Sequence, residues 1–148
     1  ESTIIDCSRG HPVLLRPGML TPAQLEAAAG QPLRTRDEQA PRASGTLESH
    51  YAPQAKVRLM DAGQIQSALD VLGADARHIA IYSRARLRSA SRHLLLREMP
   101  AQADACAQEL FAVLRGFDDA GVRLIWIETP PPDTAWDGVR DRLQRAAA

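Results

Sequence analysis

The amino-acid sequence predicts an α/β protein, in which a small three-layer α/β/α, Rossmann-like domain with a mostly parallel sheet follows a linker and a short β-rich segment. From residue 57 onward, apolar strand-like runs alternate with amphipathic helical runs. This alternation is typical of a parallel sheet that helices cover on both faces. Residues 31–56 have no sustained period and contain Pro32, Pro41, Gly45 and Pro53, as a linker does.

The β-rich segment contains the runs STIIDCS (2–8) and PVLLRPG (12–18), joined by RGH. These runs predict a hairpin or two adjacent strands. Because a two-stranded ribbon is only marginally stable in water, the strands need a sheet that the chain does not obviously contain. The sequence also starts at Glu1, close to a strand-like run. We therefore expect it to be a fragment of a longer protein.

Residues 21–30 (TPAQLEAAAG) predict a short helix with clear signals at both ends. Thr21 is the expected N-cap, and Pro22 suits the first helical position. Gln24 completes a capping box with Thr21, and Gly30 is expected to end the helix.

The C-terminal part is expected to contain strands at 57–60, 78–83, 93–99 and 122–129, and helices at 63–73, 101–121 and 134–148. The last of these strands is almost continuously apolar, which is typical of the buried centre of a sheet. The order of the strands stays open. Each helix has an apolar face that should point inward. These faces consist of Ile65, Ala68, Leu69 and Leu72; of Ala103, Ala107, Leu110, Leu114 and Phe117; and of Trp136, Val139 and Leu143.

The composition limits the classes of partner. A length of 148 residues suits one domain with a core of its own. The 18 basic and 18 acidic residues cancel, so charge alone predicts neither a nucleic-acid nor a membrane partner. No apolar run approaches the roughly 20 residues that span a bilayer. Cys7 and Cys106 form no CxxC motif, which predicts free thiols and a reducing, cytoplasmic location.

The usual catalytic signatures are absent from the C-terminal part. It contains no GxGxxG after its first strand, no GxxxxGK[ST] and no GxSxG, so a site of those types is unsupported. The four histidines do not fall at metal-ligand spacing with one another or with the cysteines. We therefore predict no catalytic residue and no metal ligand in this chain.

A cluster of arginines lies in the stretch RARLRSASRH (84–93). It could form a patch for phosphate or RNA. The alternative is a solvated loop and helix face, which the zero net charge favours. The cluster consists of Arg84, Arg86, Arg88 and Arg92.

Three other residues are candidates for ligand binding. Arg16 precedes a Pro-Gly turn, and its guanidinium there could fork onto phosphate or carboxylate or be a surface group without a role. Ser2 could donate to a small polar ligand or be structural. Tyr51 of HYAP could lay its ring on a base, donate its hydroxyl to phosphate, or fill a gap in packing.

Together these motifs resemble one family, the long form of L-threonylcarbamoyladenylate synthase, whose catalytic part is a YrdC-like domain. STIID, LLRPG, a short helix, a linker and SGTLESHYAP occur in the family's order, and IAIYSR, REMP, ELFAVLRGFDDAGV and DRLQRAAA resemble its C-terminal accessory domain. The resemblance implies that 1–20 are the last strands of an incomplete YrdC-like domain, 21–56 a short helix and a linker or lid, and 57–148 the accessory domain. Ser44 and Ser49 stand where the family often has proline and a basic residue.

The resemblance implies that the whole protein is a nucleotidyltransferase. It would convert L-threonine, bicarbonate and ATP, with Mg²⁺, into threonylcarbamoyl-AMP and pyrophosphate for the t6A modification of adenosine 37 in tRNA. Ser2 would contact threonine, Arg16 and Tyr51 would contact ATP, and His50 and Pro53 would belong to the lid. The groups that hold Mg²⁺ would lie mainly outside this chain, so we expect the chain to be inactive alone.

Two other functions stay open from the sequence. The α/β domain could be a non-catalytic module that binds a nucleotide, RNA, tRNA or a partner transferase subunit through the arginines at 84–92. It could also be purely structural, steadying the lid and setting a homo-oligomeric state, since an exposed strand edge favours self-association.

Overall fold

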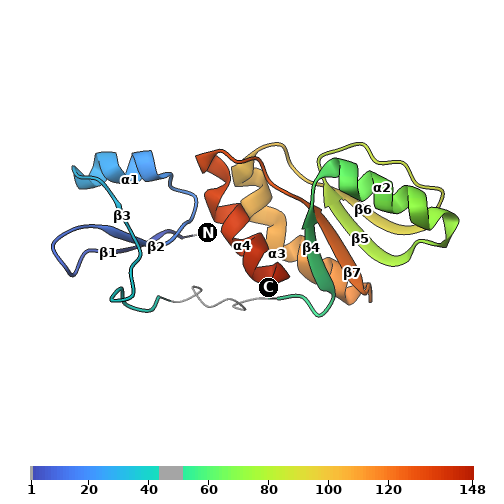
Figure 1. Cartoon of the computed structure of the whole chain (residues 1–148), viewed down its shortest axis with the longest axis horizontal. Coiled ribbons are helices and arrows are strands. Elements are labelled where there is room, and N and C mark those ends of the chain that lie inside the picture. Colours follow the sequence, from blue (N-terminus) through green and yellow to red (C-terminus); the bar gives the residue numbers. More distant parts are fainter. Residues whose placement is uncertain (1, 44–51) are drawn as a thin grey trace.

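The computed structural model describes residues 2–43 and 52–148, which form two sheets at opposite ends of the molecule (Figure 1). The N-terminal sheet has the strand order β1-β2-β3, and the C-terminal sheet has the order β4-β7-β5-β6. Helix α1 accompanies the first sheet, whereas α2, α3 and α4 surround the second (Figure 1).

The N-terminal sheet contains the predicted pair of strands and one that was not predicted. Strand β1 (Ile4–Asp6) pairs antiparallel with β2 (Val13–Arg16), and β2 pairs in parallel with β3 (Arg34–Thr35). The first strand pair is therefore confirmed. The segment predicted to be a linker contributes two residues to this sheet, because the Arg34 amide donates to the Pro12 carbonyl over 2.9 Å.

Helix α1 (Pro22–Ala29) begins and ends as predicted. The Thr21 hydroxyl accepts from the Gln24 amide over 3.3 Å, and the Gln24 side-chain carbonyl accepts from the Thr21 amide over 2.9 Å. This reciprocal pair satisfies two N–H groups that have no partner within the helix. Gly30 lies in the left-handed region with φ of 70°, where a residue without Cβ avoids strain.

All four strands of the C-terminal sheet run parallel. The predicted strands are confirmed, and their order places β6 at one edge and β4 at the other. Strand β7 lies between β4 and β5, which explains its almost continuous apolar sequence. The strands are β4 (Lys56–Met60), β5 (Arg77–Ser83), β6 (His93–Glu98) and β7 (Leu124–Glu128).

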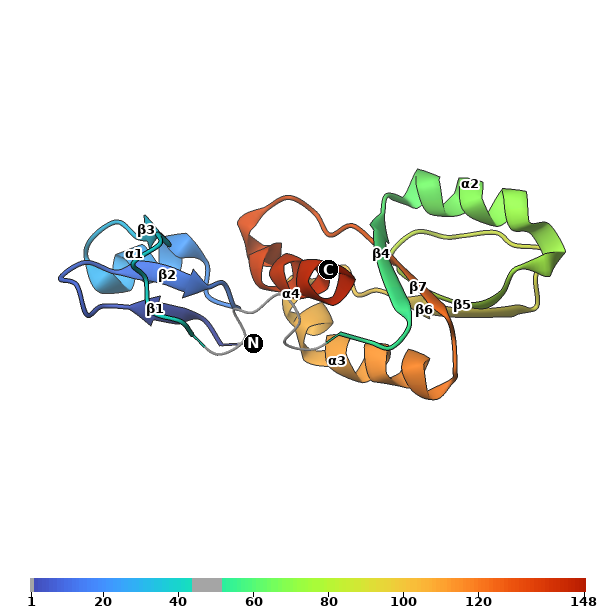
Figure 2. The ribbon, with the colours of Figure 1, turned by 60° about the horizontal axis from the view of Figure 1, so that its bottom comes forward.

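Helices cover both faces of this sheet, so the three-layer prediction is confirmed (Figure 2). Helix α2 (Ala62–Leu72) buries Ile65 and Leu69 on one face. Helices α3 (Ala103–Asp119) and α4 (Asp137–Ala147) cover the other.

The predicted apolar stripe of α3 is buried throughout. Trp136, Val139 and Leu143 also point inward as predicted, although the helix expected from residue 134 starts with a short 3₁₀ turn. The prediction for Leu72 is wrong, because its side chain is 39% exposed. Leu72 is the last residue of α2, and the chain turns away directly after it.

The two parts of the chain meet at a pair of glycines. A Cβ on Gly138 of α4 would lie 2.8 Å from the Gly18 carbonyl oxygen and 2.9 Å from its carbonyl carbon. The adjacent Met19 packs against the apolar core of the C-terminal domain. The segment directly after β2 is thus seated on α4, at a distance that only glycine permits.

No helix in the described part of the chain is long and apolar enough to cross a membrane.

Candidate functional site

The first candidate site lies where β1 begins and β2 ends. The Arg16 Nη2 donates to the Ser2 hydroxyl oxygen over 2.7 Å and to the Ser2 carbonyl oxygen over 3.0 Å. Arg16 Nε also donates to that carbonyl, over 3.1 Å. The contact follows from the strand pairing, which sets Ile4 opposite Arg16. Two residues that were singled out separately are therefore direct neighbours.

The Ser2–Arg16 pair combines a buried cation with a hydroxyl close to solvent. Arg16 is 9% exposed, whereas Ser2 is exposed. The hydroxyl of Thr3, the residue after Ser2, is buried and has no hydrogen-bond partner among the described residues. A guanidinium held at a fixed angle can fork onto phosphate or carboxylate, and hydroxyl groups can bind a small polar ligand. In this structure the Nε and Nη2 of Arg16 are bonded to Ser2 itself, so the pair sets a cation and a hydroxyl side by side.

The turn between β1 and β2 is held by its own charged groups. Asp6 accepts from the Ser8 hydroxyl over 2.6 Å and from the Ser8 amide over 2.9 Å. These hydrogen bonds, with a smaller effect of the Arg9 charge, lower the pKa of Asp6. Arg9 also bonds Asp37, over 3.0 Å, and thereby lowers the pKa of Asp37. This network fixes the turn at the end of the hairpin opposite the Ser2–Arg16 pair and links it to the chain after β3.

The lid predicted from HYAP falls largely outside the described residues. His50 and Tyr51 lie there, so their roles stay predictions. Pro53 is described and is buried. Just after it, the amides of Gln54 and Ala55 donate to the two oxygens of Asp118, over 2.9 and 3.1 Å. Asp118, which the sequence analysis did not single out, therefore anchors the C-terminal end of the linker to α3.

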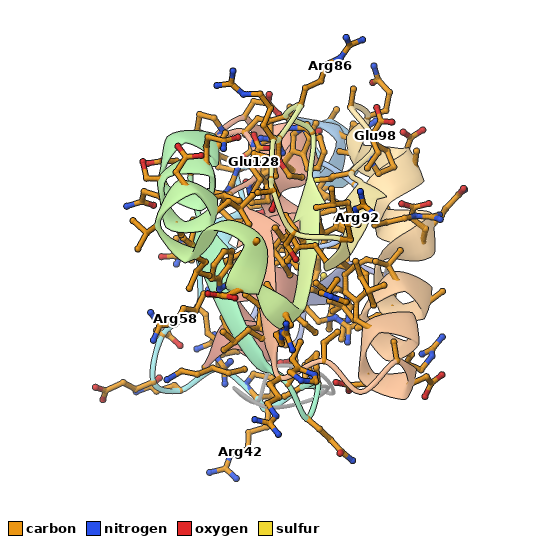
Figure 3. All side chains as sticks on the ribbon, turned by 90° about the vertical axis from the view of Figure 1, so that its right-hand side faces the viewer. Arg42, Arg58, Arg86, Arg92, Glu98 and Glu128 are labelled. Carbon is orange, nitrogen blue, oxygen red and sulfur yellow. The ribbon has the colours of Figure 1, made fainter. Side chains whose placement is uncertain are left out.

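The four arginines of residues 84–92 do not share one environment. The Arg84 guanidinium is 22% exposed and lies 2.6 Å from a Glu128 oxygen and 5.6 Å from the centre of the Trp136 ring. The other three are exposed. Arg86 projects outward at the top of the view in Figure 3, whereas Glu128 lies among the strand ends. Arg84 is therefore not part of an exposed arginine patch, whereas Arg86, Arg88 and Arg92 are exposed.

Glu128 forms the centre of a second polar cluster, at the carboxyl ends of the strands. Its Oε2 accepts from the Ser83 hydroxyl and the Arg84 amide, each over 2.7 Å, and from the Ala85 amide over 3.2 Å. Burial raises the pKa of this carboxyl group, but these hydrogen bonds and the Arg84 charge outweigh burial, and the pKa is lowered. The cluster resembles an anion site that the chain fills with its own carboxylate.

A crevice of about 330 Å³ opens beside this cluster, between the ends of β5 and β6. Ligands of parallel α/β sheets bind at such strand ends. Its charged lining consists of Arg84, Arg86, Arg97 and Glu98, and Arg84 is already paired with Glu128. Arg97 is also paired with Glu109, over 3.2 Å. The crevice therefore has no dominant charge that would indicate one class of ligand.

Tyr82 and Cys106 are reactive groups that lie in the apolar core of the C-terminal domain. Tyr82 is fully buried, and its hydroxyl donates to a Glu109 carboxylate oxygen over 2.7 Å. Burial raises the pKa of the neighbouring Cys106 thiol, so this thiol is a poor nucleophile. Both cysteines are free, as predicted. Within residues 2–43 and 52–148, no group of three or more His, Cys, Asp or Glu side chains could hold a metal ion.

Comparison with known proteins gives consistent results. Residues 20–148 match the family model described as "Threonylcarbamoyl-AMP synthase, C-terminal domain". The chain is 29% identical, over 163 aligned positions, to the threonylcarbamoyl-AMP synthase of Bacillus subtilis strain 168. That alignment covers 99% of this chain and 45% of the relative. The chain thus spans less than half the length of this relative.

Two solved structures of P. abyssi Sua5 share the fold. The complex with L-threonine has a TM-score of 0.78 at 24% identity, and it covers 99% of this chain and 45% of the other. A variant with alanine in place of an adjacent histidine and tyrosine has a TM-score of 0.79 at 23% identity, covering 99% and 44%.

Proposed function

Because the chain belongs to the family of threonylcarbamoyl-AMP synthase C-terminal domains, we propose that it is part of an enzyme that makes threonylcarbamoyl-AMP and pyrophosphate from L-threonine, bicarbonate and ATP. The product would serve the t6A modification of tRNA. The observation that carries this proposal is the contact between Ser2 and Arg16, 2.7 Å apart at their side-chain atoms. It joins the residue proposed to bind threonine with one proposed to bind ATP.

The chemistry gives each of these groups a task. The amine of threonine and bicarbonate form a carbamate with loss of water. A carbamate oxygen then attacks the α-phosphorus of ATP, a P–O bond forms, and pyrophosphate leaves. Arg16 would offset the negative charge that gathers on the phosphate, and the Ser2 hydroxyl would bind threonine beside it. Their contact would hold the two substrates at a separation suited to reaction.

The lid has a separate proposed role. Carbamates are labile in water, so closure over the site would protect the intermediate. We assign this role to His50, Tyr51 and Pro53, with Tyr51 reaching the nucleotide. The anchoring of Gln54 and Ala55 by Asp118 supports it, because a fixed point at one end limits where the lid can close. The substituted histidine–tyrosine pair of the P. abyssi variant has one counterpart in this sequence, His50–Tyr51.

The proposal places Mg²⁺ outside this chain. In support, the two carboxylates of the hairpin network, Asp6 and Asp37, are both engaged by Arg9. We assign the Mg²⁺ ligands mainly to the part of the enzyme outside this chain. We likewise propose that residues 1–20 complete a YrdC-like catalytic domain, that 21–56 form the helix and lid, and that 57–148 are the accessory domain.

The test is product formation by the full-length enzyme that contains this chain. Pyrophosphate and threonylcarbamoyl-AMP should appear together, and omission of ATP, threonine or bicarbonate should abolish both. Ser2→Ala should raise the KM for threonine and leave the KM for ATP close to its original value. Pyrophosphate release that does not need threonine would refute the proposed reaction.

The glycine contact between the two parts should also affect turnover. In Gly138→Ala, the new methyl group would lie 2.8 Å from the Gly18 carbonyl oxygen, so the segment after β2 must shift. A shift of about 1 Å in a positioning element can slow a reaction roughly 100-fold, whereas overpacking costs about 1–3 kcal/mol of stability. We expect the kcat of full-length Gly138→Ala to fall roughly 100-fold, measured at a temperature where this variant is folded.

The matched control is Gly116→Ala in α3, since a Cβ there would meet no atom within 4 Å. This variant should keep its turnover, and its stability should rise by about 0.5–1 kcal/mol. Equal turnover in the Gly138→Ala enzyme and the unmodified enzyme would show that the glycine contact does not position the site.

A further inference from the structure

Strand β6 forms an edge of the C-terminal sheet and presents leucines to solvent. Leu95 is 39% exposed and Leu96 is 56% exposed, and they are the two exposed large apolar side chains of the described residues that lie in a strand. Proteins usually protect an edge strand with charges, prolines or a covering segment. The opposite edge, β4, follows this rule, because Lys56 and Arg58 are exposed there, whereas β6 carries exposed Arg97 and Glu98 only after its three leucines.

The free backbone groups of β6 can be identified from its pairing with β5. The Met99 amide donates to the Ser83 carbonyl, and the direction of the peptide groups alternates along a strand. The amides and carbonyls of Leu94, Leu96 and Glu98 therefore point away from β5. They form a row of donors and acceptors at the edge of the sheet, ready to pair with another strand.

A groove lies beside this edge on the face that α3 covers. It has a volume of about 540 Å³ and is lined by Leu95, Val113 and Phe117, among others. The edge strand and the groove together form one apolar surface with a hydrogen-bonding rim. Such a combination is typical of a surface that another strand extends.

We propose that this surface binds β6 of a second copy of the chain, antiparallel and about a two-fold axis through Leu95, so that the two four-stranded sheets become one. An antiparallel pair needs outward-facing residues opposite each other. The register centred on Leu95 meets this condition and sets Leu94 opposite Leu96 of the second copy. It also sets Arg92 opposite Glu98 of the second copy, twice by symmetry.

This register is better on chemical grounds than the one centred on Leu96. Moving the centre to Leu96 would set Leu94 opposite Glu98 and Leu95 opposite Arg97, which would pair apolar groups with charges. The register centred on Leu95 instead joins leucines with leucines and Arg92 with Glu98, both of which stabilise cross-strand pairs. Its remaining pair sets His93 opposite Arg97. In Figure 3, Arg92 and Glu98 lie beyond β5 on the side of the molecule opposite Arg58 of β4.

The test is the oligomeric state of the full-length protein, measured by sedimentation across the micromolar range. We expect a dimer. Leu96→Arg places two like charges in the interface and should raise the dissociation constant roughly 100-fold or more. The control is Val71→Arg, because Val71 is an apolar residue of α2 that is 86% exposed and does not line the groove. This variant should leave the dimer intact.

A charge exchange tests the register itself. Arg92→Glu should weaken the dimer, and the double variant Arg92→Glu with Glu98→Arg should restore it. A monomeric protein would overturn the proposal. This includes a monomer in which another part of the same molecule covers β6 and protects its amides from hydrogen exchange. A dimer that withstands Leu96→Arg, or a double variant without rescue, would equally overturn it. Neither measurement depends on catalysis, so the interface and the proposed reaction can fail independently.

Discussion

In the full-length enzyme, Arg16→Ala is expected to slow threonine-dependent pyrophosphate release by roughly 100- to 1,000-fold, the usual cost of losing one charge-stabilising donor. The Arg16 guanidinium is buried and is fixed by three hydrogen bonds to Ser2. Because the guanidinium is already held in place, it would need little rearrangement when negative charge develops on the phosphate. Arg16→Lys should recover only part of the rate, because an ammonium group lacks the planar fork.

The control for charge is Arg115→Ala, which removes an exposed arginine of α3 and should leave the rate unchanged. Loss of stability must also be separated from loss of catalysis, since Arg16 joins the two ends of the hairpin. The assay is therefore run well below the unfolding midpoint of the Arg16→Ala enzyme. A rate within a factor of about three of the original there would contradict the role we assign to Arg16, because the effect expected is far larger.

The largest effect on stability is expected at Glu128. Glu128→Ala removes the acceptor of the Ser83 hydroxyl and of the Arg84 amide, and it also breaks the ion pair with the Arg84 guanidinium. The Ala85 amide keeps the Ser83 hydroxyl oxygen as an acceptor, and the guanidinium keeps the Thr129 carbonyl, each over 3.0 Å. Because Glu128 is 13% exposed at its side chain, water can replace few of these bonds. Unfolding by urea should show a loss on the order of 3 kcal/mol. Glu38→Ala, at an exposed carboxylate, should change stability by less than about 0.5 kcal/mol.

The pH dependence of stability gives a second measure of the same site. The pKa of Glu128 is lower in the folded protein than its ordinary value of 4.5. Its contribution to stability is therefore complete above pH 4.5 and is lost as the pH falls through the lowered pKa. The unmodified protein should lose more stability than Glu128→Gln as the pH falls below 4.5. Parallel pH profiles for the two proteins would show that the carboxylate is not stabilised as we describe.

Much of the fold could be predicted because its signals are local. The capping box of Thr21 and Gln24 needs only four consecutive residues, and the apolar stripe of α3 repeats with the helical period. Strand β3 could not be predicted, since its two exposed residues Arg34 and Thr35 carry no periodic signal. The order of the parallel strands could not be predicted either. The sequence of a strand indicates whether the strand is buried, but not which strands lie next to it.

The candidate site was only partly visible for a similar reason. Ser2 and Arg16 stood out through their motifs, but their contact depends on the register between β1 and β2. Glu128 and Asp118 did not stand out, because a carboxylate at the end of a strand or helix usually faces solvent. Their partners are 44 and 64 residues away in sequence. Only the folded chain brings these groups together.

The central claim is that this chain supplies binding groups and a lid to an active site that the rest of the enzyme completes. Its most direct test is pyrophosphate release, with ATP, threonine, bicarbonate and Mg²⁺, from three proteins: the 148-residue chain, the full-length enzyme and full-length Tyr51→Ala. We predict no release from the chain alone, rapid release from the full-length enzyme and slow release from Tyr51→Ala. Equal release from the chain alone, or an unchanged rate in Tyr51→Ala, would contradict the claim.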